Sequence, residues 1–315
     1  MKKVIGLLFT LAFILMPGQS LSAAVQKPLI NTLTARIHTC RNTGSFYNAG
    51  GSAKRVPPCV YELENFLQRF GDTIAVYYKN LNSGFAFSHN PDRVFFGASV
   101  PKLYHALYVY TLAERGYITL DTTYTYTWAD FWGGTGVMRH MPVGGYFTTR
   151  ELLSHSVRDS DNIAFRMLAR KYNHRDFSFR DFANEINANS RLSWSIIEQN
   201  VTARDAMVWA MAVHEYLQSD GRYAHYLRYD LKNTTVRFIQ AEGDICIAQK
   251  YGWYRRHFHD LAIVYENSPY ILIILSNRGE DGGAHVYNTP TVTHELFEEI
   301  SLHVQEFNNR YFGRR

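Results

Sequence analysis

The position of the strand-like segments along the chain constrains the fold more than any other feature. β-rich runs occur at residues 73–79 and 85–88, and again at 243–250, 260–266 and 270–276. Between them, the stretch from residue 100 to about 237 is mainly helical in its apolar spacing. The simplest fold that satisfies this order has one antiparallel sheet built from both ends of the chain. An all-helical region is then inserted in the middle.

Helical spacing also predicts where individual helices lie and how some of them begin. Thr148 is followed three residues later by Glu151, which is a capping-box pattern, and Thr202 stands in the same relation to Asp205. Helices at both ends would cover the sheet, so we expect an α/β (α+β) three-layer sandwich with an inserted all-helical subdomain. The expected helices span residues 61–70, 102–116, 162–172, 177–186, 203–218 and 291–307.

The first residues have the pattern of an export signal. Lys2 and Lys3 precede an apolar run at residues 4–16, and small residues follow up to Ala24. The run is too short for a comfortable transmembrane helix, and no later run is long enough. We therefore expect cleavage near Ala24 and a secreted or extracytoplasmic protein, with a retained N-terminal anchor as the alternative.

These patterns divide the chain into three parts. Residues 1–24 would be the signal peptide, 25–60 a polar and irregular N-terminal segment, and 61–315 the folded domain, with its helical insert at about 100–237. Removing Lys2 and Lys3 lowers the formal charge from +5 to +3. This net positive charge is small, and the sequence has no cluster of Arg and Lys interleaved with aromatic residues. Both observations argue against a nucleic-acid partner. We expect a monomer.

The three cysteines do not have the spacing of a metal site. Cys40 and Cys59 flank a loop rich in Gly, Asn and Pro, and outside the cytoplasm they could form a disulfide or remain two free thiols. Cys246 lies in a predicted strand and is expected to be a small buried hydrophobe. His257 and His259 alternate along one strand face without a third ligand, so we expect neither a metal nor a cofactor.

The segment Ser99-Val100-Pro101-Lys102 could carry a nucleophile at the start of a helix. Ser99 would be the N-cap and Pro101 would fit the first turn. The positive end of the helix favours an oxyanion there. Lys102 would lie near Ser99, and a desolvated lysine can act as a base towards a hydroxyl. The alternative is an ordinary serine cap beside a solvated lysine.

Two later segments could complete such a site. Ser160-Asp161-Asn162 offers a hydroxyl that can shuttle a proton and an amide that can donate to a carbonyl, although all three residues also suit a helix cap. Gly134-Thr135-Gly136 precedes it. Lys250-Tyr251-Gly252 ends a predicted strand, where Lys can hold a carboxylate and Gly lets a substrate backbone approach. The alternative there is a strand end entering a turn.

Together the three segments resemble the class A β-lactamase and penicillin-binding-protein superfamily, whose motifs are S-x-x-K, S-D-N and K-T-G. The resemblance extends from about residue 62 to the final helix. It implies a β-lactamase/transpeptidase-like fold and a β-lactam or peptidoglycan-peptide substrate. It also assigns roles: nucleophile Ser99, base Lys102, proton shuttle Ser160, substrate contacts Asn162, Lys250, Tyr251 and Gly252, and an oxyanion hole from the backbone N–H groups of Ser99 and Trp253.

The chain departs from the family pattern in two places. Tyr251 stands where the family has Thr or Ser, which puts recognition of a substrate carboxylate in question. No E-x-x-L-N sequence is present to supply a deacylating base; Glu198 is a better candidate than Glu185, which fits a solvated helix face. We expect a serine hydrolase acting on β-lactams. The alternatives are a D-Ala-D-Ala carboxypeptidase or endopeptidase, and a wall-binding protein that hydrolyses slowly or not at all.

Overall fold

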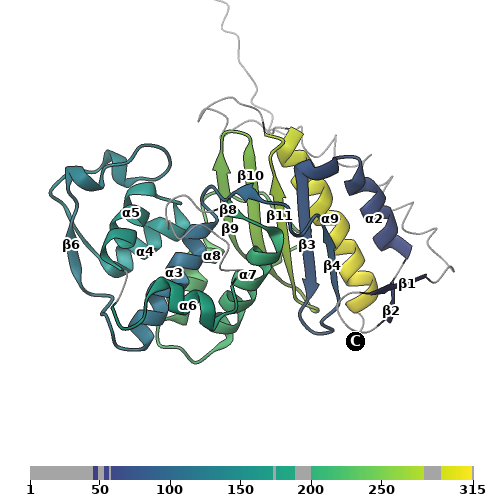
Figure 1. Ribbon diagram of the computed structural model, residues 1–315, viewed down its shortest axis with the longest axis horizontal. Coiled ribbons are helices and arrows are strands. Elements are labelled where there is room, and N and C mark those ends of the chain that lie inside the picture. Colours follow the sequence, from purple (N-terminus) through teal and green to yellow (C-terminus); the bar gives the residue numbers. More distant parts are fainter. Residues whose placement is uncertain are drawn as a thin grey trace, which may run out of the picture. The chain divides into compact units, whose positions relative to one another are not determined.

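A five-stranded antiparallel sheet forms the centre of the fold (Figure 1). The computed structural model describes residues 45–48, 53–56, 58–172, 175–188, 200–279 and 292–313, which all belong to the unit Cys40–Arg315. The strand order is β4-β3-β11-β10-β9, so strands from the start of the domain pair with strands from its end. The predicted sheet from both ends of the chain is confirmed. Its strands are β3 (Ile74–Asn80), β4 (Ala86–His89), β9 (Cys246–Tyr254), β10 (His257–Tyr265) and β11 (Tyr270–Ser276).

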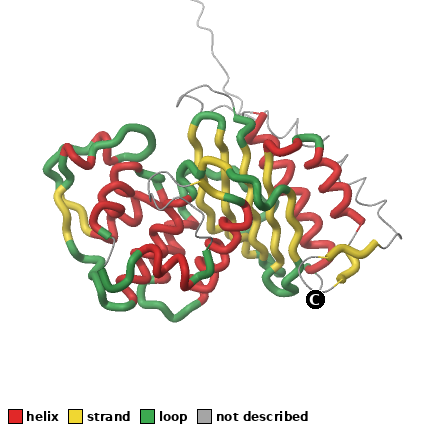
Figure 2. Tube along the Cα trace, viewed as in Figure 1, coloured by secondary structure: helices red, strands yellow, loops and turns green. Residues whose placement is uncertain are grey.

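Helices cover both faces of this sheet (Figure 2). On one face, α9 (Val292–Phe312) and α2 (Pro58–Gln68) pack against it, and the ring centroids of Tyr78 and Phe307 are 5.7 Å apart. On the other face, Ile273 and Leu275 belong to the core shared with the helical insert. Every residue of β11 is buried, which explains its continuous apolar sequence.

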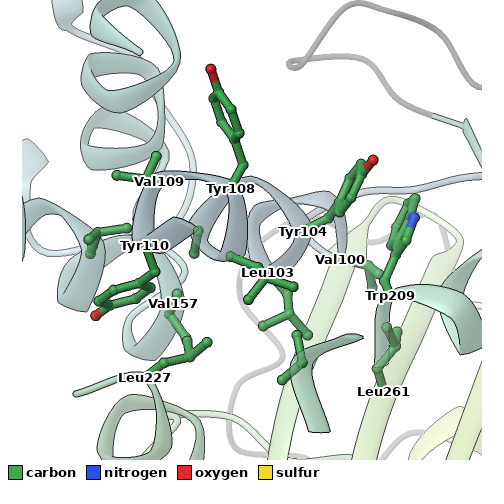
Figure 3. Close-up of a cluster of buried hydrophobic side chains, with 14 of the residues drawn as sticks. Val100, Leu103, Tyr104, Tyr108, Val109, Tyr110, Val157, Trp209, Leu227 and Leu261 are labelled. Atoms are coloured by element: carbon green, nitrogen blue, oxygen red, sulfur yellow. The ribbon is translucent and has the colours of Figure 1, made fainter. Parts of the chain in front are cut away.

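The helical insert is built around α3 (Pro101–Glu114), of which only Thr111 and Glu114 are not buried. A helix that is apolar on all sides must lie inside its domain. Figure 3 shows its side chains packed between neighbouring elements, with the rings of Tyr104 and Trp209 stacked 4.8 Å apart. The surrounding helices are α4 (Thr149–Arg158), α5 (Asn162–Lys171), α6 (Phe179–Glu185), α7 (Ala203–Gln218) and α8 (Ala224–Lys232).

Two predicted helix starts are confirmed. The backbone N–H of Thr148 donates to the carboxylate of Glu151 (2.7 Å), while the Glu151 N–H donates to the Thr148 hydroxyl (3.2 Å). The hydroxyl of Thr202 accepts from the N–H of Asp205 (3.1 Å). These caps could be predicted because the interaction is confined to four consecutive residues.

Several short elements were not predicted, because runs of two to four residues carry no usable periodicity. These are the paired strands β1 (Ser45–Asn48) and β2 (Ala53–Val56), β5 (Phe95–Phe96) and β8 (Asn200–Val201), and β6 (Thr123–Thr125) and β7 (Tyr146–Thr148), with 3₁₀ turns at Gly71–Thr73, Trp128–Asp130 and Met138–His140. Within the described residues, no helix has the length and apolar character needed to cross a bilayer.

Three local predictions were wrong. The N-cap of α3 is Val100, without a side-chain cap, so Ser99 lies in the preceding turn and does not cap the helix. The strand β9 does not end at Lys250 but continues to Tyr254, because the β-favouring aromatic residues that follow Lys250 pair with β10. Cys246 is a half-buried free thiol and not a fully buried one.

Asn308 joins α9 to the sheet through its buried side-chain amide. Its Oδ1 accepts from the Tyr78 hydroxyl (2.7 Å) and from Asn80 Nδ2 (2.9 Å), and its Nδ2 donates to the Ser268 carbonyl (2.8 Å). Replacing one partner of such a buried network leaves the others without their hydrogen bonds.

We predict that Asn308→Ala lowers the free energy of unfolding by about 2–4 kcal/mol, because buried donors lose their acceptor. Urea denaturation measures this. The control is the neighbouring Asn309→Ala, at an exposed position, which should change the free energy of unfolding by less than about 0.5 kcal/mol. Equal effects of the two changes would contradict the role of Asn308.

Candidate active site

The three sequence motifs meet where β9 faces the helical insert. The hydroxyl of Ser160 lies 2.9 Å from Lys250 Nζ and 3.4 Å from Lys102 Nζ. Gly252 lies against the turn that carries Ser99, since a Cβ added to it would be 3.0 Å from the Ser99 backbone nitrogen. Residues up to about 150 positions apart therefore form one cluster. None of the three motifs, taken alone, shows which other residues lie beside it in the fold.

Lys102 lies in the first turn of α3 and is almost fully buried (3% exposed). Its Nζ donates to the Ser160 carbonyl (2.5 Å) and to Asn162 Oδ1 (2.7 Å). Burial lowers its pKa to about 7, and the nearby Asp161 carboxylate opposes this only partly. A lysine of this kind loses its proton close to neutral pH and becomes available as a base.

Lys250 has no exposed surface and faces the same hydroxyl from the sheet. Its Nζ contacts Ser160 Oγ and donates to the Tyr251 carbonyl (2.8 Å). Burial, and then the charge of Lys102, lower its pKa well below the usual range for lysine. Two amines that share a hydroxyl in a dry site titrate as a pair, because a charge on one disfavours a charge on the other. Ser160 can therefore pass a proton between them.

The Ser160-Asp161-Asn162 turn does contain the helix cap that its residue types favour, but only Asp161 provides it. Asp161 Oδ1 accepts from the N–H groups of Ile163 (2.8 Å) and Ala164 (2.9 Å) at the start of α5. Ser160 has a left-handed backbone (φ 52°), which costs free energy for a residue with a side chain. With this conformation, the Ser160 side chain lies beside both lysines and the Asn162 side chain lies beside Lys102.

A glycine-rich loop, Gly133–Gly136, packs against this turn and hydrogen-bonds to it. The Asn162 side-chain amide donates to the Gly133 carbonyl (2.8 Å), and the Thr135 hydroxyl donates to the Ser160 carbonyl (2.8 Å). Gly136 has φ +115°, and a Cβ there would be 2.1 Å from Asp161 Oδ2. In the sequence, this loop could be recognised only as a Gly-Thr-Gly segment that precedes the second motif. Its contacts show that it supports the turn.

The free edge of the sheet lies beside Ser99. β9 is an edge strand, and its two-residue turn to β10 makes Tyr254 and His257 a directly opposed pair. Antiparallel pairing then alternates, so the backbone N–H of Trp253 points away from β10 towards the outer edge. Because Gly252 touches the turn at Ser99, the N–H groups predicted to form an oxyanion hole belong to neighbouring backbone segments.

Tyr251 is buried (2% exposed). Its ring lies edge-on to Phe238, with centroids 5.8 Å apart, and its centroid is 4.3 Å from Lys250 Nζ. The ring therefore packs beside the lysine, where the family has a small hydroxyl side chain.

Sequence reasoning assigned no role to Asp260, which opens the predicted strand after the third motif. Its Oδ2 accepts from the N–H groups of Phe238 (2.9 Å) and Ile239 (3.0 Å), and burial raises its pKa to about 7. It therefore attaches the segment after α8 to β10, next to Tyr251. The available signal was the only acidic residue of this strand, just before the apolar run at residues 261–264.

Other predicted residues lie elsewhere or outside the described part. Glu198 and Cys40 are outside the described residues, as is the side chain of Cys59. Glu185 is half-exposed and pairs with Arg115 at 2.5 Å, as expected for a solvated helix face.

The fold and the cluster of motifs define a β-lactamase-like serine hydrolase, and comparison with known proteins agrees. The profile of the β-lactamase enzyme family matches residues 59–306, so the chain belongs to that family. No curated protein matches it.

Solved structures with this fold share little sequence with the chain. A point mutant of PBP-A, in an acyl-enzyme complex with penicillin G, is 17% identical (TM-score 0.69; 80% of this chain and 96% of that one covered). A β-lactamase from Sphaerobacter thermophilus is 18% identical (TM-score 0.66; 80% and 97%). A class A β-lactamase from Mycobacterium abscessus is also 18% identical (TM-score 0.65; 81% and 100%). These similarities confirm the predicted fold class.

We predict that Gly136→Ala lowers the free energy of unfolding by about 3 kcal/mol, because it combines a left-handed backbone with a clash against Asp161. Gly133→Ala is the matched control, since a Cβ there meets nothing within 4 Å. Urea denaturation of both variants tests the contact. A Gly136→Ala protein as stable as Gly133→Ala would show that the loop does not pack tightly on the turn.

Proposed function

We propose that this protein is an acyl-enzyme hydrolase that opens the amide bond of β-lactams through an ester on Ser99. The observation that carries the proposal is the pair of buried lysines, Lys102 and Lys250, joined through the Ser160 hydroxyl. A site with such groups can remove a proton from one atom and deliver it to another without free water.

In the proposed acylation, neutral Lys102 takes the proton of the Ser99 hydroxyl as Ser99 Oγ attacks the lactam carbonyl. The carbonyl oxygen becomes negatively charged and is stabilised by the backbone N–H groups of Ser99 and Trp253. The C–N bond then breaks, and the leaving nitrogen takes a proton from the Ser160 hydroxyl. Ser160 regains a proton from the lysine pair, which leaves an ester on Ser99.

Substrate would be held along the edge of β9 in this proposal. The Asn162 amide would contact the acyl-side amide of the substrate, and Gly252 would leave room for its backbone. A substrate carboxylate placed beside Lys250 would favour the charged form of that lysine, which would then hold the carboxylate. Tyr251 fills the position of the small hydroxyl residue in the family, so we expect carboxylate recognition to rest mainly on Lys250.

The fate of the ester depends on a base that activates water, and we propose Glu198 for this role. The sequence lacks the E-x-x-L-N pattern of efficient class A enzymes. This absence favours one alternative, a penicillin-binding D-Ala-D-Ala carboxypeptidase or endopeptidase in which the ester persists. The basic start at Lys2 and Lys3, with the apolar run after it, supports export of the protein to the compartment where either substrate occurs.

Incubation with penicillin should add the mass of the intact antibiotic to the protein, and Ser99→Ala should abolish this adduct, because it removes the attacking oxygen. Intact-mass spectrometry over time measures both formation and loss. An adduct that forms and disappears supports the hydrolase, whereas a lasting adduct supports the carboxypeptidase alternative. No adduct at millimolar penicillin would contradict acylation altogether.

The acylation rate should depend on pH through the lysine pair. The pKa of Lys102 is lowered to about 7, so its neutral form is scarce below that pH and predominates above it. We predict that the rate constant rises about tenfold per pH unit below an apparent pKa near 7 and levels off above it. Stopped-flow acylation from pH 5.5 to 8.5 measures this. The control, Lys102→Arg, should be slow throughout, and a flat profile in the parent protein would contradict Lys102 as the base.

A further inference from the structure

One cross-strand pair contacts the Ser99 turn from two sides. Gly252 on β9 and His259 on β10 are directly opposed residues. A Cβ on Gly252 would lie 3.0 Å from the backbone nitrogens of Ser99 and Val100, so β9 approaches the end of the turn as closely as a backbone can. His259 reaches the beginning of the same turn, where its Nε2 lies 2.7 Å from the Phe96 carbonyl oxygen.

The hydrogen bonds of His259 fix which ring nitrogen carries the proton. The backbone N–H of Ser276 donates to Nδ1 (3.3 Å), so Nδ1 is the acceptor. Nε2 must then be the protonated nitrogen, and it donates to the Phe96 carbonyl. The ring is fully buried, with Phe95 edge-on at 5.9 Å, and burial lowers the pKa of His259 to about 3. The imidazole therefore stays neutral and keeps both bonds at neutral pH.

The turn held in this way is strained. The Val100 N–H donates to the Gly97 carbonyl (3.0 Å), and Ala98 has a left-handed backbone with φ 48°. A residue with a side chain keeps such a conformation only when its surroundings hold it there. Immediately before this residue, Phe95 and Phe96 pair with β8, the Phe96 ring packs against Tyr254, and the Phe96 carbonyl accepts the bond from His259.

We propose that His259 is a positioning residue that holds the Ser99 turn against β9, and so sets where the Ser99 N–H lies relative to the Trp253 N–H. This inference rests on the proposed function, in which those two N–H groups stabilise the oxyanion. A hydrogen-bond donor that is displaced from the developing charge loses most of its effect on the rate. Loss of the Phe96 bond should therefore slow acylation more than it weakens binding of the intact lactam.

Two substitutions separate the two bonds of His259. His259→Asn can place its amide oxygen near Nδ1 and accept from Ser276, but it is too short to reach Phe96. His259→Gln can place an N–H near Nε2 and keep the bond to Phe96. We expect His259→Asn to lower the acylation rate constant at saturating penicillin about tenfold, with little change in the half-saturating concentration. His259→Gln should lose less than about threefold.

The control for general destabilisation is His303→Asn, which removes another buried imidazole from α9, a helix on the opposite face of the sheet. It should reduce thermal stability without slowing acylation. The inference is overturned if His259→Asn acylates as fast as the parent protein, if the Asn and Gln variants are equally slow, or if His303→Asn slows acylation as much.

A spectroscopic measurement keeps this inference separate from the proposed function. Nitrogen chemical shifts of labelled histidine should show His259 protonated at Nε2 only, and the Phe96 carbonyl shift should change in His259→Asn but not in His259→Gln. If the parent protein forms no penicillin adduct, the proposed function fails, and these shifts alone decide the role of His259. Protonation at Nδ1, or an unchanged Phe96 shift in His259→Asn, would overturn it.

Discussion

Burial of two lysine amines beside one serine hydroxyl is the constraint on which the rest of this site depends. Removing an amine from water disfavours its charged form, so burial lowers the pKa of both Lys102 and Lys250, and both amines bond to the Ser160 turn. Each other feature of the turn keeps that arrangement in place. Asp161 caps α5, Thr135 binds the Ser160 carbonyl, and the glycines of the loop allow the close approach.

The second constraint is the position of β9 at the edge of the sheet. An edge strand has backbone groups that face outward, and here the two-residue turn after Tyr254 determines which ones they are. Gly252 permits contact with the Ser99 turn, while its cross-strand partner His259 holds the start of that turn. The sheet therefore acts as a rigid support for the turn that carries Ser99, just before the helical insert.

Elements governed by local sequence were predicted well. The bounds of α7 and β11 match the expected ranges, because a sustained helical period of apolar residues, or a short continuous apolar run rich in isoleucine, leaves little choice. Ser99 was wrongly assigned as an N-cap because serine suits the cap in general, whereas the tertiary fold uses it in a strained turn before Val100. The continuation of β9 beyond Lys250 was missed because its pairing partner β10 lies later in the chain.

The sequence by itself determined the order of the five sheet strands and of most helices, the helix starts at Thr148 and Thr202, and the three motifs that point to a serine hydrolase. All of these depend on residues close together in the chain. Only the tertiary structure decided that both lysines share the Ser160 hydroxyl, that Tyr251 packs against Phe238, and that His259 bonds to Phe96. Those contacts join residues about 13 to 160 positions apart, and their distances and pKa shifts arise from burial that exists only after the chain has folded.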